Sequence, residues 1–123
     1  MKAIMSGALA LAAIGGATVT AQAASRPQTA HHAALLARVN VAASEFKFVL
    51  SKKSAKRGVV VFKVTNVGKL QHNFEISGRK TKMLSHGQSA TLRVTFLRKG
   101  AYPYQCTVPG HAAAGMKGVF TIS

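Results

Sequence analysis

The chain of 123 residues carries 17 lysines and arginines against two acidic residues, which gives a formal net charge of +15 at pH 7. Both acidic residues are glutamates, Glu45 and Glu75, so no Ser/His/Asp triad can be assembled and a paired-carboxylate mechanism fits poorly. The sequence also lacks a glycine-rich phosphate loop. These features argue against hydrolytic chemistry, whereas the positive charge predicts anionic partners.

Residues 1–23 resemble a secretory signal peptide. Lys2 precedes a stretch of apolar or small residues from Ala3 to Val19, and Ala21-Gln22-Ala23 matches an Ala-x-Ala cleavage signal. We expect cleavage after Ala23 and a periplasmic or secreted protein of about 100 residues, the size of one domain. An uncleaved membrane anchor is the alternative, although the glycines and threonines in the stretch make it less favourable.

Residues 24–38 are polar and rich in alanine, and they show little of the alternation expected of a strand. We interpret them as a flexible N-terminal tail that precedes a single domain over residues 39–123. The tail contains His31 and His32, which could scavenge metal adventitiously, but an exposed and mobile N-terminus is the favoured interpretation.

From residue 39 onward the sequence has the pattern of short β-strands. Apolar and polar residues alternate in several series, and turn signals such as Arg57-Gly58 and Lys99-Gly100 separate them. A last strand is expected over Gly118–Ile122. The spacing predicts an all-β fold, a Greek-key β-sandwich. The residues expected to face its core are Phe46, Phe48 and Leu50, then Val60, Phe62 and Val64, and then Ala90, Leu92, Val94 and Phe96.

The stretch from Tyr102 to Gly118 contains the only cysteine of the chain. Cys106, His111 and Met116 follow one another at intervals of five residues, and Pro109-Gly110 provides a turn between the first two. Each residue alone has an ordinary explanation, because cysteine and methionine are common in cores and a single histidine is common on a surface. Their occurrence together in one loop instead predicts a metal site.

A second histidine can complete this site. His72, Phe74 and Ile76 share one face of an expected strand, so His72 can lie at the same end of the fold as Cys106. A thiolate, two imidazoles and a thioether form a ligand set that suits copper in both oxidation states. Zinc could also occupy nitrogen and sulfur ligands in vitro. The lone cysteine fits export, since no second thiol competes for it.

These motifs resemble those of the cupredoxins, the small blue copper proteins of the plastocyanin and azurin kind. The resemblance covers about Val39 to Ser123 and is carried by His72-Asn73-Phe74, Tyr102-x-Tyr104-x-Cys106, Cys106-Thr107-Val108-Pro109-Gly110-His111 and Met116-Lys117-Gly118. It implies one type 1 copper site with His72, Cys106 and His111 as equatorial ligands and Met116 as the axial ligand. It also implies that Asn73 and Thr107 tie the two ligand loops together.

The resemblance implies an electron carrier rather than an enzyme, because the chain encodes no second metal site. A periplasmic copper store or chaperone, and a copper-bearing subunit of a larger oxidoreductase, are the alternatives. We expect a monomer that meets acidic redox partner proteins, or an anionic membrane surface, with docking at the rim formed by residues 112–114 beside His111. Nucleic acid is not an expected partner, because the basic runs lack interleaved aromatic residues.

Overall fold

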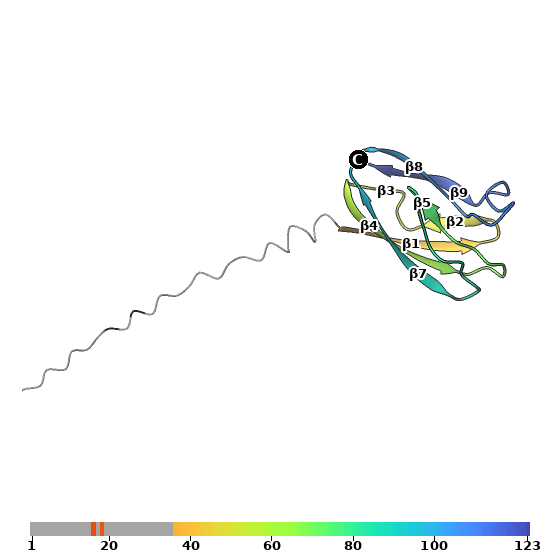
Figure 1. The fold of residues 1–123 in the computed structure, drawn as a ribbon, viewed down its shortest axis with the longest axis horizontal. Coiled ribbons are helices and arrows are strands. Elements are labelled where there is room, and N and C mark those ends of the chain that lie inside the picture. The colour runs from red at the N-terminus through yellow and green to blue at the C-terminus, as the bar shows by residue number, and fades with distance from the viewer. Residues whose placement is uncertain (1–15, 17, 19–35) are drawn as a thin grey trace, which may run out of the picture.

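The computed structural model describes residues 16, 18 and 36–123, and residues 36–123 form two β-sheets packed face to face (Figure 1). Nearly all of the predicted signal peptide and most of the predicted tail lie outside these residues. Over the described positions, no helix is long and apolar enough to cross a membrane. Residues 36–123 contain strands, turns and bends but no helix, which confirms the predicted all-β sandwich.

One sheet has four strands in the order β2-β1-β4-β7, and the other has five in the order β3-β9-β8-β5-β6. In the first sheet β4 lies parallel to β1 and antiparallel to β7. In the second, β8 is antiparallel to both β5 and β9. The strands are β1 (Leu36–Ser44), β2 (Lys47–Leu50), β3 (Ser54–Ala55), β4 (Gly58–Asn66), β5 (Glu75–Ile76), β6 (Arg79–Lys80), β7 (Ser89–Phe96), β8 (Gly100–Gln105) and β9 (Lys117–Ile122).

The core lies between the two sheets and is built from the residues that alternation assigned to the inner faces. Val60, Phe62 and Val64 of β4 are fully buried, as the sequence predicts. The ring of Phe62 contacts those of Phe74 at 5.2 Å and Phe120 at 5.3 Å between centroids. Aromatic pairs of this kind contribute about 0.5–1.5 kcal/mol each beyond the area they bury. These contacts hold the two sheets together beneath the ligand loops.

Two local features differ from the sequence-based expectation. Strand β1 begins at Leu36 rather than at Val39, because its parallel pairing with β4 already starts at Leu36 and Val59. Phe46 was expected to face the core with Phe48 and Leu50, and this was wrong: its side chain is 40% exposed. The β1–β2 hairpin pairs Ser44 with Lys47, which leaves Phe46 in the two-residue turn rather than in a strand.

The two loops that carry the predicted ligands and the turn between β1 and β2 meet at one end of the sandwich, which we call the site end. They are the β1–β2 turn (residues 45–46), the β4–β5 loop (67–74) and the β8–β9 loop (106–116). The opposite end, where β1, β4 and β8 begin and β7 and β9 end, is called the distal end (Figure 1). The C-terminus lies at the distal end.

Candidate metal centre

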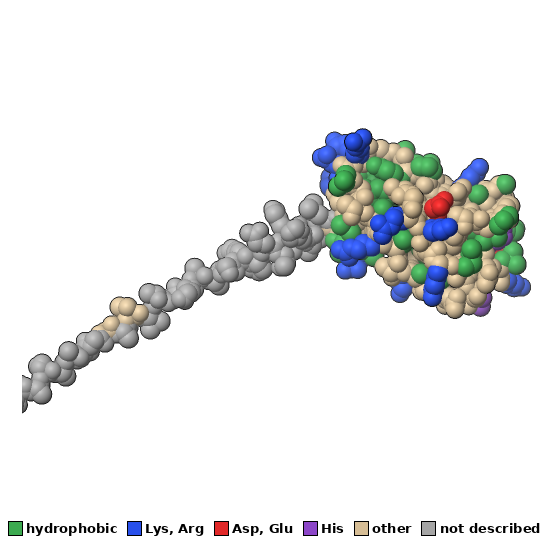
Figure 2. Space-filling model, in the orientation of Figure 1, with side chains coloured by type: hydrophobic (Ala, Val, Ile, Leu, Met, Phe, Trp, Pro, Cys, Tyr) green, Lys and Arg blue, Asp and Glu red, His purple; other side chains and the backbone are tan. Residues whose placement is uncertain are grey.

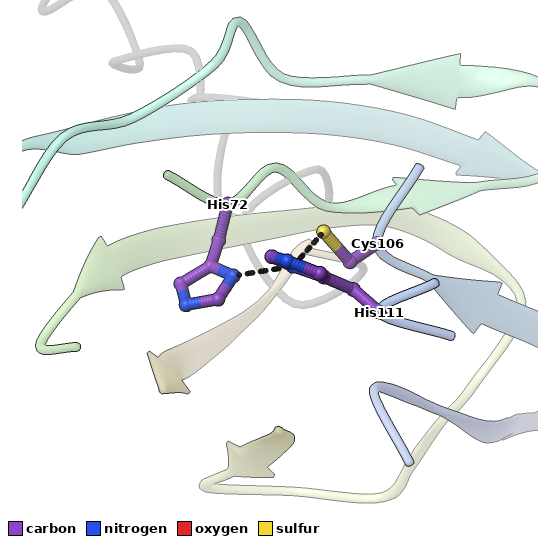
Figure 3. Close-up of side chains that lie close together, drawn as sticks. All are labelled: His72, Cys106 and His111. Atoms are coloured by element: carbon purple, nitrogen blue, oxygen red, sulfur yellow. Dashed lines mark hydrogen bonds between the residues drawn. The ribbon is translucent and has the colours of Figure 1, made fainter. Parts of the chain in front are cut away.

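Three buried donors converge at the site end. The side chains of His72, Cys106 and His111 are 0%, 1% and 9% exposed, and their ligand atoms all lie within 4.8 Å of one another. The Nδ1 atoms of the two imidazoles face each other at 3.2 Å, and the Cys106 Sγ lies 3.7 Å from His111 Nδ1 (Figure 3). The structure therefore brings together three of the four predicted ligands, and this soft donor set fits copper.

The strand end and the loop hydrogen bonds position Cys106 and His111. Cys106 follows β8 directly, and its N–H donates to the carbonyl of Met116 at 3.1 Å. The N–H of Met116 in turn donates to the carbonyl of His111 at 3.0 Å. The loop also needs Gly115, since its φ is +129° and a Cβ there would come within 2.8 Å of the Phe46 carbonyl oxygen. A short, internally bonded loop thus holds both donors.

Met116 is fully buried and packs with Cys106 and Ala43 in a small apolar cluster beside the site. Val108 and Phe48 pack against the same cluster. The Met116 side chain therefore lies beside Cys106, among side chains that exclude water. Its assignment as the axial ligand stays a prediction.

His72 is held by both its backbone and its ring. Its main chain forms a two-way β-bridge with Leu84, with N–O distances of 3.1 and 2.8 Å. Its Nε2 lies 3.3 Å from Oε1 of Glu45, on the side of the ring opposite to the donor group. An Nε2–H donated to this carboxylate leaves Nδ1 without a proton and free to bind a metal. A carboxylate partner of this kind fixes the tautomer and the orientation of a ligand histidine.

Glu45 remains ionised because the chain around it supplies hydrogen bonds. Its Oε1 accepts from the backbone N–H groups of Leu70 and Lys69, at 2.5 and 2.8 Å. The bond from Leu70 is the largest cause that lowers the pKa of Glu45 from 4.5 to about 2, with the His72 side chain a smaller one. Gly68 leaves room for this arrangement, since a Cβ there would collide with the carboxylate. Sequence reasoning missed Glu45, whose only signal is that it is one of two acids in a strongly basic chain.

His111 lies at the surface edge of the donor group. Burial lowers the pKa of its imidazole, and the neighbouring His72 lowers it further, so the neutral form that binds metals is favoured. The ring of Phe46 packs edge-on against His111, with centroids 5.2 Å apart and planes at 73°. The outward position of Phe46 therefore has a role that the strand pattern did not indicate: it covers the more exposed of the two histidines.

Two further polar residues join the ligand loops. The Asn73 side-chain amide donates to Thr107 Oγ1 at 2.7 Å, and the Thr107 backbone N–H donates to Asn73 Oδ1 at 2.8 Å. This reciprocal pair confirms the tie implied by the family resemblance. His86, by contrast, is exposed and its Nδ1 faces the Gly68 carbonyl at 2.7 Å, outside the donor group, in agreement with its omission from the predicted site.

Comparison with known proteins agrees with this geometry. The family model "copper binding proteins, plastocyanin/azurin family" matches residues 35–123. Auracyanin-B of Chloroflexus aurantiacus is 44% identical over 43 residues, covering 35% of this chain and 18% of that protein, so the match spans under a fifth of the relative. Reduced auracyanin from Roseiflexus castenholzii has a TM-score of 0.59 at 23% identity, covering 72% of this chain and 97% of that one.

A multicopper oxidase also resembles this structure, with a TM-score of 0.58 at 16% identity over 71% of this chain and 44% of the oxidase. At these identities the solved structures establish the fold alone. The family match, however, covers well over half of the sequence and includes all three clustered donors. The chain belongs to the plastocyanin/azurin family of copper-binding proteins, the cupredoxins, and its His72, Cys106 and His111 form a group that fits one type 1 copper site.

Proposed function

We propose that this protein is an exported, monomeric type 1 copper protein that carries single electrons between redox partners and catalyses no reaction of its own. The observation that carries the proposal is the convergence of two imidazole Nδ1 atoms and one thiol Sγ in a buried group. His72, Cys106 and His111 are the proposed equatorial ligands. Met116, buried against Cys106, is the proposed axial ligand.

Copper bound there would supply one-electron chemistry, because thiolate, imidazole and thioether ligands accommodate both Cu(I) and Cu(II). The protein holds the ligand side chains rigidly and excludes water from the site. Glu45 orients His72, the Asn73–Thr107 pair locks the two ligand loops together, and the hydrogen bonds within the β8–β9 loop fix Cys106. Donors held in this way need little rearrangement when the charge at the site changes by one unit.

Electrons would leave and enter through His111, the most exposed of the three donors. A groove of about 390 Å³ opens beside it and is lined mainly by apolar or uncharged side chains. Exposed Ala113 and Ala114 lie in the same loop as His111. An apolar surface around a histidine edge suits the small contacts, under about 1,200 Å², of transient redox encounters. The groove residues are Leu70, Gln71, Met83, Thr107, Val108, Pro109 and His111.

The proposed redox partner is an acidic protein. Four exposed lysines lie around the site end, and the whole chain carries a formal charge of +15. Such charge accelerates encounters with acidic partners by factors of roughly 10–10³ at low salt. The proposed location is the periplasm or the outside of the cell, supported by the signal-like residues 1–23. The four lysines are Lys47, Lys69, Lys82 and Lys117.

Burial of the donor group favours a carrier over a copper store, because a store must release its ion readily. The test is spectroscopic. Addition of Cu(II) to the metal-free protein should produce an intense visible thiolate-to-copper band that a reductant bleaches reversibly. The variant Cys106→Ser should lack the band while its far-UV circular dichroism stays that of the wild type. An intense band in Cys106→Ser, or the absence of a band in the wild type, would reject the proposal.

A further inference from the structure

Basic side chains gather at the distal end, far from the donor group, although the sequence distributes them over three turns. The backbone of Arg57 donates to the Ser123 carbonyl at 3.0 Å, and the carbonyl of Lys53 accepts from the Thr121 N–H at 3.1 Å. These bonds bring the segment around β3 to the end of β9. Figure 2 shows lysine and arginine side chains gathered at this end, with others over the middle of the face and at the far end, where the histidines lie. We name as the distal basic cluster the exposed residues Lys53, Lys56, Arg57, Arg98 and Lys99.

The β7–β8 turn adds an apolar tip to this cluster. Leu97 is 78% exposed, more than any other large hydrophobic side chain that the structure describes, and it directly precedes Arg98 and Lys99. The turn lies beside Arg57, because Gly58 pairs with Phe96 across β4 and β7. An exposed leucine flanked by long cationic side chains is typical of surfaces that enter the headgroup region of a membrane.

The cations of the distal basic cluster are not neutralised within the domain by either glutamate. Glu45 lies at the site end against His72, and Glu75 pairs with Gln105 next to the metal ligand Cys106. Among residues 36–123, no lysine or arginine forms an ion pair with a glutamate. The charges are therefore available to an external anion.

The chain also enters the domain at the distal end. Leu36, the first residue of β1, pairs with Val59 at the distal end, so the preceding residues join the domain there. Those residues include the apolar stretch from Ala3 to Val19. Any attachment of that stretch to a membrane would therefore reach the domain from its distal end.

We propose that the distal basic cluster and Leu97 bind an anionic lipid surface, with Leu97 inserted among the headgroups. In this orientation the His111 edge faces the aqueous phase, where a soluble redox partner can reach it. The binding depends on no metal, so this proposal goes beyond electron transfer and stands independently of it.

A single tryptophan can report which end contacts lipid, because the chain contains none. Leu97→Trp places the reporter in the proposed surface, and Val67→Trp places it at an exposed apolar position of the β4–β5 loop at the site end. With vesicles of equimolar phosphatidylcholine and phosphatidylglycerol, the emission of Leu97→Trp should shift to the blue. That of Val67→Trp should not. An equal shift in both variants, a shift only in Val67→Trp, or an equal shift with pure phosphatidylcholine would overturn the proposal.

Two charge variants of the full chain provide the matched comparison, because each removes four positive charges and both keep the same N-terminal residues. The distal variant should bind the anionic vesicles at least about tenfold more weakly than the wild type, since each cation near such a surface adds to the attraction. The site-end variant should bind within about threefold of the wild type. The distal variant is Lys53→Gln, Lys56→Gln, Arg98→Gln and Lys99→Gln, and the site-end variant is Lys47→Gln, Lys69→Gln, Lys82→Gln and Lys117→Gln.

Thermal unfolding of both charge variants should match that of the wild type, since all eight side chains are exposed. Equal loss of vesicle binding in the two variants would show that binding depends on net charge and not on the distal basic cluster, and it would overturn the proposal. The proposal would also be overturned if the emission of Leu97→Trp did not change with vesicles but shifted with soluble poly-glutamate. That result would assign the surface to binding of an acidic protein. Vesicle binding that is lost only in the distal variant supports the proposal.

Discussion

Oε1 of Glu45 lies 3.3 Å from Nε2 of His72, while Nδ1 of the same ring faces His111 in the donor group. One imidazole thus joins a fixed carboxylate on one side to the metal-binding group on the other. The same carboxylate oxygen accepts hydrogen bonds from the backbone N–H groups of Lys69 and Leu70, which belong to the loop that leads into His72. The orientation of His72 is therefore set by the turn between β1 and β2 of the four-stranded sheet.

Glu45→Gln should weaken copper binding by about 10–100-fold, because outer partners of ligand histidines typically contribute that much. The amide oxygen can still accept from the loop, but the charge that holds the His72 Nε2–H is lost. Competitive titration against a copper chelator measures the effect. Glu75→Gln is the control, since the Glu75 carboxylate accepts a hydrogen bond from the exposed Gln105 side chain and not from His72. Equal losses in both variants would contradict a specific role for Glu45.

Gly68→Ala tests the same contact without a change of charge. A methyl group at Gly68 would occupy the space of the Glu45 carboxylate, so the carboxylate must move away from His72. We expect a loss of copper affinity in the same direction as that of Glu45→Gln. The double variant should be little weaker than Glu45→Gln alone, because both changes break one interaction. Full additivity of the two losses would show that Gly68 acts elsewhere.

Met116→Leu should keep copper and the visible band but shift the reduction potential. Leucine has nearly the same volume as methionine, so the apolar cluster with Ala43 and Cys106 is preserved, while the soft axial sulfur is removed. Protein-film voltammetry measures the potential. Complete loss of copper binding in this variant would contradict the axial assignment, and so would an unchanged potential.

Added imidazole should rescue the band of His111→Ala better than that of His72→Ala. The cavity left by His111 lies at the surface under the edge of Phe46, whereas His72 is fully buried and its ring is enclosed by Glu45. The measurement is the amplitude of the visible band as imidazole is titrated into each copper-loaded variant. Equal rescue of the two variants would contradict the surface position of His111.

The metal-free protein should lose stability in acid through two identifiable groups. The pKa of Glu45 is about 2 in the folded state against 4.5 as its ordinary value, so its stabilisation is present above pH 4.5 and is lost as the pH falls towards 2. The pKa of His111 is lowered from 6.5, so the unfolded state takes up that proton first and stability falls as the pH drops below 6.5. Glu75 is the only other acidic side chain, so the total loss should be small for a protein of this size.

Urea unfolding of the metal-free protein between pH 7 and about pH 3 separates the two contributions, since this range spans the ordinary titration of histidine and of carboxylates. In His111→Gln, the free energy of unfolding should no longer decline from near pH 6.5 downwards. In Glu45→Gln, it should no longer decline below pH 4.5. Copper retention should fail at higher pH than the fold, because protons compete with the metal for its ligands. A decline that persists in both variants would contradict the assignment.

The sequence by itself predicted most of the strands and the candidate ligands. Alternation in β4 and β7 predicted which side chains enter the core, because a strand places successive side chains on opposite faces whatever it packs against. The candidate ligands were recognisable because Cys106, His111 and Met116 share one loop, and few other uses require that combination of donors. The pair Asn73 and Thr107 was predicted from the family resemblance, and the structure confirms their contact.

Only the tertiary structure decided which distant residues complete the site. Glu45 is separated from His72 by 27 positions and reaches it because the β1–β2 hairpin and the β4–β5 loop meet at one end of the sandwich. Alternation wrongly assigned Phe46 to the core, because a local pattern cannot tell the last residue of a turn from the first residue of a strand. Strand pairing likewise forms the distal basic cluster, because it brings the segment around β3 and the β7–β8 turn to the same end of the sandwich. Local patterns determine faces and ligand types, and long-range pairing determines which loops share an end.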